Sequence, residues 1–566
     1  MTAIWKRKRT EDLSKLKADK ELARLSDNVL QVLASRGFRD AQSAKAVLYG
    51  ELSDLHDPSL LKDADKAVKY LMQWIKEGRV FLVYGDYDAD GVTSATIMTS
   101  LLRGAGARVD YWANDRFAHG YTITPDSIDA MLLKHPETEV IVTVDNGISG
   151  HAGIAHAMKL GLEVIITDHH DVGETIPECV AVVNPHQKDC PYPFKGLCGA
   201  SVAFKLMHLL YFRMGLPIEH VYDTLDLVAL GTVADVMPQL DENRIMIRKG
   251  FEKAMRGDRK AFSILREVLA PKTIDARSVF GFSYGPAINS IGRLDGDPSI
   301  AIELFLTDDE TRMKEIATYL KTRNEDRSAL TRELCEVAIE MVEKVGVKHM
   351  NVVYSPDFHE GLTGLIASRL KERYNRPFFV FTDAKGNTLK GSGRGIEGFH
   401  LKRAMDKCPE TLVGYGGHAK AAGASTTLAL IDSFAEKMNK FAEEELTEED
   451  FQKVITVEIP LTPEGLTLDF IEDLRVLEPF GEAFPPPVIG LMAFQVRSEF
   501  RMGSEKQHAK LKGDSLDVII WNDGNLYDEL GRPAVIKAIG NPDINDYMGK
   551  RSVQFKADAE NVRSAG

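Results

Sequence analysis

Apolar residues in the first part of the chain recur with the spacing of amphipathic helices, over residues 12–80. From Val80 the pattern changes, and short runs rich in β-branched residues alternate with helix-like stretches such as 93–103 and 152–160. The strand-like runs are 80–84, 108–112, 140–144, 164–167 and 180–183. Buried strands that alternate with helices predict βαβ units and a mostly parallel sheet.

Helical spacing returns over residues 299–345, where Thr307 and Glu310 fit a capping box. Because this stretch is long for one helix, we expect it to bridge two domains. A second α/β pattern runs from Asn351 to about Phe441, and an acidic run over 443–450 marks a boundary. The last ~80 residues combine β-rich runs with turn signals, which predicts a small barrel of about five strands.

These changes divide the chain into five segments. We expect an N-terminal helical segment packed on the core (1–60), a catalytic α/β domain (61–298), a connecting helix (299–345), a second α/β domain (346–445) and a barrel with its linker (446–566). A chain of 566 residues suggests about four domains, which agrees with this division.

Composition narrows the class of protein. Hydrophobic residues make up 44% and charged residues 27% of the chain, which is typical of a globular protein. The net charge of −14 argues against coating of nucleic acid by overall charge but leaves room for a local basic groove. Five cysteines without a C-x-x-C pair indicate reduced thiols. The chain has no apolar run of ~18 residues, which a membrane span needs, and no apolar run follows the basic residues 6–9, as a secretory signal needs. We therefore expect a cytoplasmic protein with no membrane contact.

Acidic and imidazole side chains follow several apolar runs. Asp86, Asp88 and Asp90 follow the run at 80–84, Asp145 follows 140–144, Asp168, His169 and His170 follow 164–167, and Asp235 follows a fourth run at 225–230. Ligands of an open α/β sheet bind beyond the carboxyl ends of its strands. The sequence therefore predicts one rim that gathers all four groups.

Each group has a simpler interpretation when it is taken alone. An Asp after a strand is usually a helix N-cap, and Asp86, Asp88 and Asp90 could begin a calcium loop, although Ile97 occupies its twelfth position. Four such groups on one rim are poorly explained as caps, because clustered carboxylates repel one another unless cations lie between them.

Carboxylates with imidazoles and no thiolate suit Mn²⁺ or Mg²⁺. Such a cluster can hold two ions ~3.5–4 Å apart, which activate a water and neutralise charge at a phosphorus centre. The predicted reaction is hydrolysis of a phosphate ester or anhydride.

The motifs Asp88-x-Asp90, Asp145, Asp168-His169-His170 and Asp235 resemble those of the DHH phosphoesterase superfamily. The resemblance is to its single-strand-specific bacterial exonucleases and covers nearly the whole chain, including segments 114–117, 120–121, 285–293, 361–369, 390–394 and 416–418. It implies a DHH-type parallel-sheet domain, a long connecting helix, a DHH-associated α/β domain and a C-terminal OB-fold β-barrel.

The resemblance also implies residue roles. The implied metal ligands are Asp86, Asp88, Asp90, Asp145, His169 and Asp235. The implied catalytic residues are His170, which supports the scissile phosphate, Asp168 beside it, and Arg293 and His418 near the DNA backbone. The implied phosphate or DNA contacts are Arg116, Ser392, Arg394 and Asn289, with Lys510 and Trp521 as candidates in the barrel, where a core position for Trp521 is an equal alternative. Guanidinium groups suit this assignment because they hold phosphate through two hydrogen bonds.

The implied activity is metal-dependent 5′→3′ exonuclease digestion of single-stranded DNA to mononucleotides, in recombination and DNA repair. The expected cofactors are two Mn²⁺ or Mg²⁺ ions. The expected partners of the monomer are a strand with a 5′ end, single-strand-binding protein and a helicase. One alternative is a DHH phosphodiesterase or phosphatase acting on short oligonucleotides or cyclic dinucleotides, which needs neither barrel nor bridge. Another is a non-catalytic replication scaffold, which the complete set of motif acids disfavours.

Overall fold

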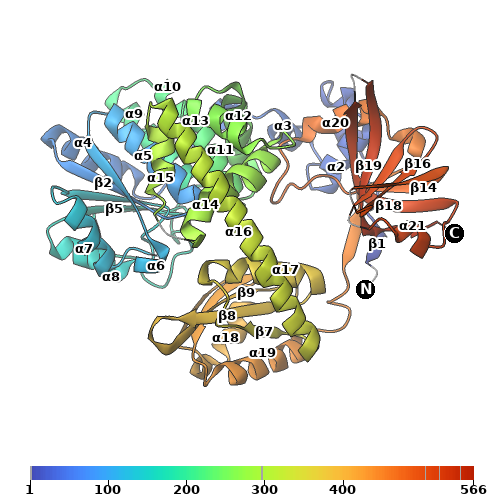
Figure 1. Cartoon of the computed structure of the whole chain (residues 1–566). Coiled ribbons are helices and arrows are strands. Elements are labelled where there is room, and N and C mark those ends of the chain that lie inside the picture. Colours follow the sequence, from blue (N-terminus) through green and yellow to red (C-terminus); the bar gives the residue numbers. More distant parts are fainter. Residues whose placement is uncertain are drawn as a thin grey trace.

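The computed structural model describes residues 3–120, 122–294, 297–503, 505–521, 523–547 and 550–565, so Tyr121 of the recognised motifs lies outside the described residues. Two α/β lobes are joined by one long helix, and a β-barrel stands beside the first lobe (Figure 1). None of the described helices combines the length and the apolar character needed to cross a membrane.

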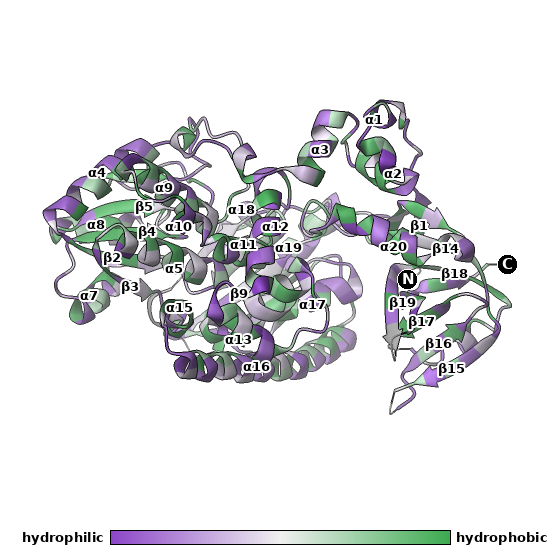
Figure 2. Cartoon of the chain, turned by 90° about the horizontal axis from the view of Figure 1, so that it is seen from above, coloured by the Kyte–Doolittle hydropathy of each residue, from purple (hydrophilic) through white to green (hydrophobic). Residues whose placement is uncertain are grey.

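The first lobe contains a five-stranded sheet in the order β3-β2-β4-β5-β6. All its strand pairs are parallel, as predicted. The strands are β2 (Val80–Gly85), β3 (Arg108–Ala113), β4 (Val140–Val144), β5 (Glu163–Thr167) and β6 (Ala181–Val183). The hydrophobic colouring of β4 and β5 in Figure 2 reflects their burial inside the lobe, where all of β4 and all of β5 except Glu163 are buried.

Helices cover both faces of this sheet. One face packs against α4 (Ala64–Glu77), α5 (Ala89–Gly104) and α9 (Gly199–Met214). The other face packs against α7 (Pro125–Lys134) and α8 (His151–Lys159). The short helix α6 (Arg116–His119) follows β3. A further helical layer consists of α10 (Glu219–Tyr222), α11 (Leu225–Ala234), α12 (Asp241–Arg256), α13 (Lys260–Leu269), the π-helix η4 (Arg277–Tyr284), α14 (Gly285–Leu294) and α15 (Ser299–Leu306).

The apolar run at 225–230 is part of helix α11, not the strand-like end that we expected. Every residue from Leu225 to Val233 is buried. A helix enclosed on all sides needs no polar face, so its sequence shows one continuous apolar run without helical periodicity.

The predicted connecting helix over 299–345 is two helices in the structure, α15 (Ser299–Leu306) and α16 (Glu310–Val345). The bridge is α16, which has 36 residues and a length of about 54 Å. Its first half packs into the first lobe through Met313 and Leu320, and its second half packs on the second lobe through Leu334 and Val342. The prediction of a capping box formed by Thr307 and Glu310 was wrong. Asp309 caps the helix by accepting hydrogen bonds from the backbone N–H groups of Thr311 and Arg312.

The second lobe has a five-stranded sheet in the order β10-β11-β9-β8-β7. Only β7 and β8 in this sheet are parallel. Its elements are β7 (Asn351–Tyr354), α17 (Thr363–Tyr374), β8 (Phe378–Ala384), β9 (Thr388–Arg394), α18 (Leu401–Asp406), β10 (Gly414–Gly417), β11 (Ala421–Thr426) and α19 (Ile431–Glu445).

The barrel is a seven-stranded mixed sheet where about five strands were expected. Its strands are β13 (Ile459–Leu461), β14 (Ile489–Gln495), β15 (Ser498–Met502), β16 (His508–Lys512), β17 (Asp517–Trp521), β18 (Val535–Tyr547) and β19 (Lys550–Ser564). The helices α20 (Leu468–Leu474) and α21 (Leu526–Glu529) complete it.

Residues 3–49 of the N-terminal segment pack mainly on the barrel, not on the core of the catalytic lobe as we expected, whereas Leu52 and Leu55 do pack against that core. Its elements are β1 (Ile4–Arg7), α1 (Ser14–Lys17), α2 (Asp27–Ser35) and α3 (Ala41–Tyr49). Strand β1 pairs in parallel with β12 (Val454–Val457), and Leu16, Leu30 and Leu33 share one apolar cluster with Phe555 of the barrel. An amphipathic pattern shows that a face is buried but not which partner buries it.

Arg244 of α12 ties the catalytic lobe to both other segments at this junction. Its buried guanidinium donates hydrogen bonds to the carbonyl oxygens of Val47 (2.6 Å), Leu477 (2.6 Å) and Pro479 (2.7 Å). It also lies over the ring of Phe484, 4.5 Å from the centroid. One side chain therefore holds α3, the lobe and the barrel linker together.

We expect Arg244→Met to lower the free energy of unfolding by about 3 kcal/mol, because it leaves several buried carbonyls without donors. Urea unfolding measures the loss. The control is Arg256→Met on the same helix, whose partner is the surface residue Asp258 and whose loss we expect to be below about 0.5 kcal/mol. Equal losses in the two variants would contradict the role of Arg244 as the tie.

Candidate metal centre

The predicted rim exists at the carboxyl ends of three strands. Asp86 and Asp88 follow β2, Asp145 follows β4, and the Asp168-His169-His170 segment follows β5. Asp90 lies in the first turn of α5. Asp235 reaches the same place from the C-terminal end of helix α11, not from a strand.

His169 lies among three carboxylates. Its Nε2 atom is 3.1 Å from Asp145 Oδ1, 3.5 Å from Asp235 Oδ2 and 3.7 Å from Asp90 Oδ2. Three groups of potential ligand atoms each lie within 4.8 Å of one another: Asp86, Asp88 and Asp145; Asp90, His169 and Asp235; and Asp145, His169 and His170. All six expected ligands therefore meet, and Asp145 belongs to two adjoining groups.

Backbone N–H groups at two helix starts hold two of these carboxylates. Asp88 Oδ1 accepts hydrogen bonds from the N–H groups of Asp90 and Gly91, both 3.0 Å long. Asp90 accepts from the N–H groups of Gly199 (2.6 Å) and Ala200 (2.9 Å) at the start of α9. A helix start carries partial positive charge, which stabilises an anion there.

The sequence analysis missed Gly199 and Ala200. A Cβ atom at position 199 would lie 2.4 Å from Cβ of Asp145, so only glycine fits there. The available signal was a small-residue pair that begins an apolar helical run, but nothing in the sequence connects it with an aspartate 109 residues away.

Asp168 belongs to none of the three ligand groups and instead orients His170. Its Oδ1 accepts from His170 Nδ1 (2.7 Å), and its Oδ2 accepts from the N–H of Ile148 (2.9 Å). Burial acts to raise the pKa of Asp168, but its hydrogen bond with His170 and the charge of that residue hold the pKa below its ordinary value. Burial acts to lower the pKa of His170, but Asp168, with Asp86 and Asp235, raises it to about 10. In the cation-free cluster His170 is therefore an imidazolium.

The remaining carboxylates fit divalent cations. Asp86 Oδ1 and Asp145 Oδ1 are buried and accept no hydrogen bond. Burial and neighbouring carboxylates raise the pKa values of Asp86, Asp145 and Asp235 well above their ordinary range. Burial of a hydrogen-bond acceptor without a donor costs free energy of folding. Cations among these oxygens would supply the missing partners. Oxygen-rich ligands with an imidazole and no thiolate suit Mn²⁺ and Mg²⁺.

Backbone strain lies next to the ligand Asp235. Val236 has φ of 57°, in the left-handed region that disfavours β-branched residues. The N–H of Val236 bonds to Val233 O and that of Met237 to Thr232 O, which is the Schellman arrangement that normally has glycine at this position. Such strain costs on the order of 1–3 kcal/mol and concentrates at functional sites.

A second site lies between the two lobes. A cavity of about 340 Å³ is lined by Arg116 of the first lobe and by Thr363, Lys390 and Ser392 of the second. Ser392 Oγ accepts a hydrogen bond from Thr363 Oγ1 at 3.2 Å. Arg394 does not line the cavity. It lies two residues after Ser392 on β9, and its Nε donates to Ser368 Oγ at 3.1 Å. Thr363 and Lys390 are additional lining residues that the prediction did not name as ligands.

Three further predicted residues surround the metal centre. Asn289 Oδ1 accepts from the N–H of Ala89 at 2.6 Å, so it positions the start of α5 and leaves only its amide NH₂ for DNA. Arg293 Nη1 donates to Gly361 O at 3.4 Å across the lobe boundary. His418 Nδ1 is 3.2 Å from Oδ2 of Asp171, the residue after His170, so this hairpin of the second lobe reaches the rim.

The two barrel candidates lie apart from this centre (Figure 1). Lys510 Nζ is paired with Asp517 Oδ2 at 2.6 Å. Trp521 is 38% exposed and lies edge-on to His508, with ring centroids 4.7 Å apart. Of the two alternatives for Trp521, the structure supports the surface position.

Comparisons with known proteins find similarity over the same regions. Family models match as the DHH family N-terminal domain (residues 80–232), the DHHA1 domain (344–444) and the RecJ OB domain (457–559). The chain is 35% identical to the single-stranded-DNA-specific exonuclease RecJ of Escherichia coli, over 95% of this chain and 96% of that protein. It is 33% identical to the RecJ of Bacillus subtilis, over 96% of this chain and 69% of that protein.

Solved structures agree. The crystal structure of RecJ with Mn²⁺ from Thermus thermophilus matches with a TM-score of 0.85 and 27% identity, covering 99% of this chain and 79% of that one. The Mg²⁺ complex from the same organism matches with a TM-score of 0.79, 25% identity and coverage of 99% and 78%.

We expect Asp235→Asn to raise the melting temperature of the cation-free protein by a few degrees, because it removes one of the repelling buried carboxylates. In excess MnCl₂ the same variant should gain less stability than the unchanged chain, because its folded state has lost one ligand and binds Mn²⁺ more weakly. Thermal melts with EDTA and with MnCl₂ measure both effects.

Asp171→Asn is the matched control, since Asp171 lies beside the cluster but in none of its ligand groups. It should leave the Mn²⁺-induced gain unchanged. If Asp235→Asn retained the full gain, Asp235 would not be a ligand.

Proposed function

Because this chain belongs to the RecJ family, whose curated members are single-stranded-DNA-specific exonucleases, we propose that it hydrolyses single-stranded DNA from the 5′ end. It releases mononucleotides and acts in recombination and DNA repair. The observation that carries this proposal is the juxtaposition of the six-ligand acidic cluster with a cavity that contains Arg116 and Ser392. The acidic cluster suits the phosphate that reacts, and the cavity suits the phosphate at the 5′ end of the strand.

The proposed metal ligands are Asp86, Asp88, Asp90, Asp145, His169 and Asp235. When two Mn²⁺ or Mg²⁺ ions are bound, they supply activation of water and neutralisation of charge at phosphorus. Backbone N–H groups at the starts of α5 and α9 hold the carboxylates of Asp88 and Asp90 in place. The domain limits 61–298, 346–445 and 446–566 then correspond to the catalytic, 5′-end-binding and strand-binding parts.

His170 is the proposed contact to the scissile phosphate. Its Nδ1–H donates to the Asp168 carboxylate, which stabilises the protonated ring and directs Nε2 away from Asp168. In the protonated state Nε2–H is a charged donor, and such donors bind a phosphate oxygen strongly. Arg293 and His418 lie on either side of the same lobe boundary. They are the proposed contacts to the DNA backbone next to the scissile phosphate.

The cavity between the lobes is the proposed pocket for the 5′-phosphate. Arg116 provides a buried guanidinium and Ser392 a hydroxyl. Arg394 lies outside the cavity lining, two residues after Ser392 on the same strand, and is the proposed second guanidinium for the bound phosphate. Because the two sides of the cavity come from different lobes, α16 determines their separation.

The same function assigns roles to the barrel, to partner proteins and to the state of the chain in the cell. The barrel residues Lys510 and Trp521 are proposed strand contacts, a basic and an aromatic group of the kind that hold single strands. The proposed partners are single-strand-binding protein and a helicase, and the proposed state is a cytoplasmic monomer. The complete ligand set disfavours a non-catalytic scaffold, and the barrel disfavours a phosphatase of small substrates.

We expect Asp90→Ala to abolish nucleotide release, because it removes a ligand from the centre of the cluster. The assay follows end-labelled single- and double-stranded DNA with Mn²⁺, Mg²⁺ or a chelator. The unchanged chain should digest only the single strand and only with metal. Because Asp90 also accepts two backbone N–H groups, Asp90→Asn and a circular dichroism spectrum test folding. Near-normal activity in either folded variant would refute the metal assignment.

We expect Arg394→Ala to reduce the preference for a 5′-phosphorylated end over a 5′-hydroxyl end by about tenfold, which corresponds to one charge-assisted hydrogen bond of about 1.4 kcal/mol. The ratio of kcat/KM for the two substrates measures the preference. Arg403→Ala in the same lobe is the control, since its partner is the distant Glu445. An unchanged ratio in Arg394→Ala would place the pocket elsewhere.

A further inference from the structure

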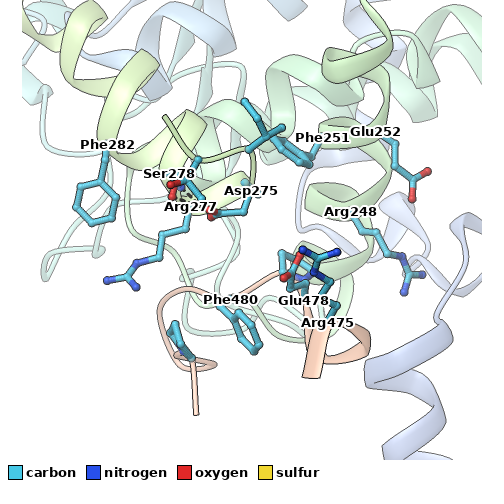
Figure 3. Close-up of a pocket in the computed structure, with 15 residues that line it drawn as sticks. Arg248, Phe251, Glu252, Asp275, Arg277, Ser278, Phe282, Arg475, Glu478 and Phe480 are labelled. Atoms are coloured by element: carbon cyan, nitrogen blue, oxygen red, sulfur yellow. Dashed lines mark hydrogen bonds between the residues drawn. The ribbon is translucent and has the colours of Figure 1, made fainter. Parts of the chain in front are cut away.

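A cleft that no residue of the acidic cluster lines separates two other parts of the molecule. It has a volume of about 790 Å³ and is formed by three segments: α12, residues 273–282 and the barrel linker 475–486 (Figure 3). The cleft therefore separates the catalytic lobe from the segment that leads into the barrel. A strand held both by the metal centre and by the barrel must cross this junction.

The wall on the lobe side is the π-helix η4. Phe280 and Tyr284 of this helix are buried, but Phe282 is 67% exposed at the cleft. The guanidinium of Arg277 lies over the Phe282 ring, 5.2 Å from its centroid, and both side chains project from the same side of the helix (Figure 3). π-helical turns are rare and frequently occur at functional sites.

Arg277 is the cation in this cleft that is available for an anion. Arg248 donates to the backbone carbonyls of Leu48 and Gly50, and Arg475 is paired with Glu472 at 2.8 Å. No carboxylate in the part of the chain that the structure describes lies within ion-pair distance of Arg277. Three acids line the cleft. Asp275 accepts hydrogen bonds from the N–H and hydroxyl of Ser278, Glu252 lies on α12, and Glu478 lies on the barrel linker.

The π-helix is coupled to the metal centre by close packing. A Cβ atom at Gly285 would lie 2.9 Å from Ala234 Cβ, so the helix contacts the end of α11 that carries Asp235. The π-helix continues directly into α14, whose Asn289 holds the start of α5. From Phe282 to Asn289 the chain advances about 10 Å along the helix axis, so a strand leaving the metal centre reaches Phe282 within a few nucleotides.

We propose that Phe282 and Arg277 form a binding position for the DNA strand on the 3′ side of the cleaved phosphate, where a base stacks on Phe282 and a neighbouring phosphate contacts Arg277. This inference rests on the proposed exonuclease function and adds a substrate-binding position to it. An exposed aromatic ring beside an unpaired guanidinium is the combination that holds single strands without regard to sequence. The 5′-phosphate pocket, the metal centre and this position then follow one another along the strand.

The test compares Phe282→Ala with the unchanged chain on a long 5′-phosphorylated single strand and on a 5′-phosphorylated dinucleotide. The dinucleotide occupies the metal centre but is too short to reach the cleft. We expect KM for the long strand to rise about tenfold, as for loss of one stacked base, with kcat and the dinucleotide kinetics unchanged. Phe282→Tyr should restore the KM. Arg277→Gln should lower the slope of log affinity on log salt concentration by about 0.7, the value for one phosphate contact on a single strand.

Phe212→Ala is the matched control, because Phe212 is 70% exposed near the opposite end of α9 from the metal centre, and it should change neither substrate's kinetics. A long-strand KM that stays within twofold in Phe282→Ala would overturn the proposal, and so would an equal loss on the dinucleotide. If the unchanged chain hydrolyses neither substrate, the exonuclease function is wrong and this position falls with it.

Discussion

Mutual repulsion of buried carboxylates at one edge of the parallel sheet is the constraint around which the catalytic lobe is arranged. Five aspartates and His169 converge where β2, β4 and β5 end and where α5 begins and α11 ends. Two helix starts offset part of the charge, because their N–H groups bind Asp88 and Asp90. The oxygens that these donors do not reach, on Asp86 and Asp145, face one another. Small residues make the convergence possible, since a Cβ at Gly91 would lie 2.4 Å from Asp86 O and one at Gly231 would lie 2.6 Å from Asp90 Oδ1.

The other parts of the molecule are fixed in position relative to this edge. Helix α16 carries the second lobe, so that Arg116 and Ser392 from different lobes line one cavity. Arg244 fixes the barrel linker to α12, and the linker forms one wall of the cleft that contains Phe282. Rigid elements therefore connect the acidic edge, the cavity lined by Arg116 and Ser392, and the cleft that contains Phe282. The negative net charge of the chain is compatible with DNA binding because the positive groups are local to these sites.

Much of this organisation could be predicted from the sequence, because buried parallel strands have distinctive apolar runs. The five strands of the first sheet begin and end within one residue of their predicted positions. The acidic and imidazole groups that follow three of these strands could be predicted to meet, because the carboxyl ends of parallel strands share one rim, whereas Asp235 reaches that rim from a helix end. Helix α11 was mistaken for a strand-like run because complete burial removes helical periodicity. The contacts of Gly199 and Ala200 with Asp90, and of Asn289 with Ala89, could not be predicted, because backbone hydrogen bonds between distant segments leave no local pattern. The destination of the N-terminal leucines was also inaccessible, since a hydrophobic face does not specify its partner.

That destination has a consequence for how the protein is made. Strand β1 pairs with β12, some 450 residues later in the chain, and the leucines of α1 and α2 lie in the same cluster as barrel residues up to Val562. On the ribosome, this segment emerges well before the barrel and can bury its apolar side chains only after the barrel has been made. Domains usually fold in the order of their synthesis, and here both α/β lobes can fold while the N-terminal segment waits. Its leucines stay exposed until then, and a truncated product that lacks the barrel would keep that surface permanently uncovered.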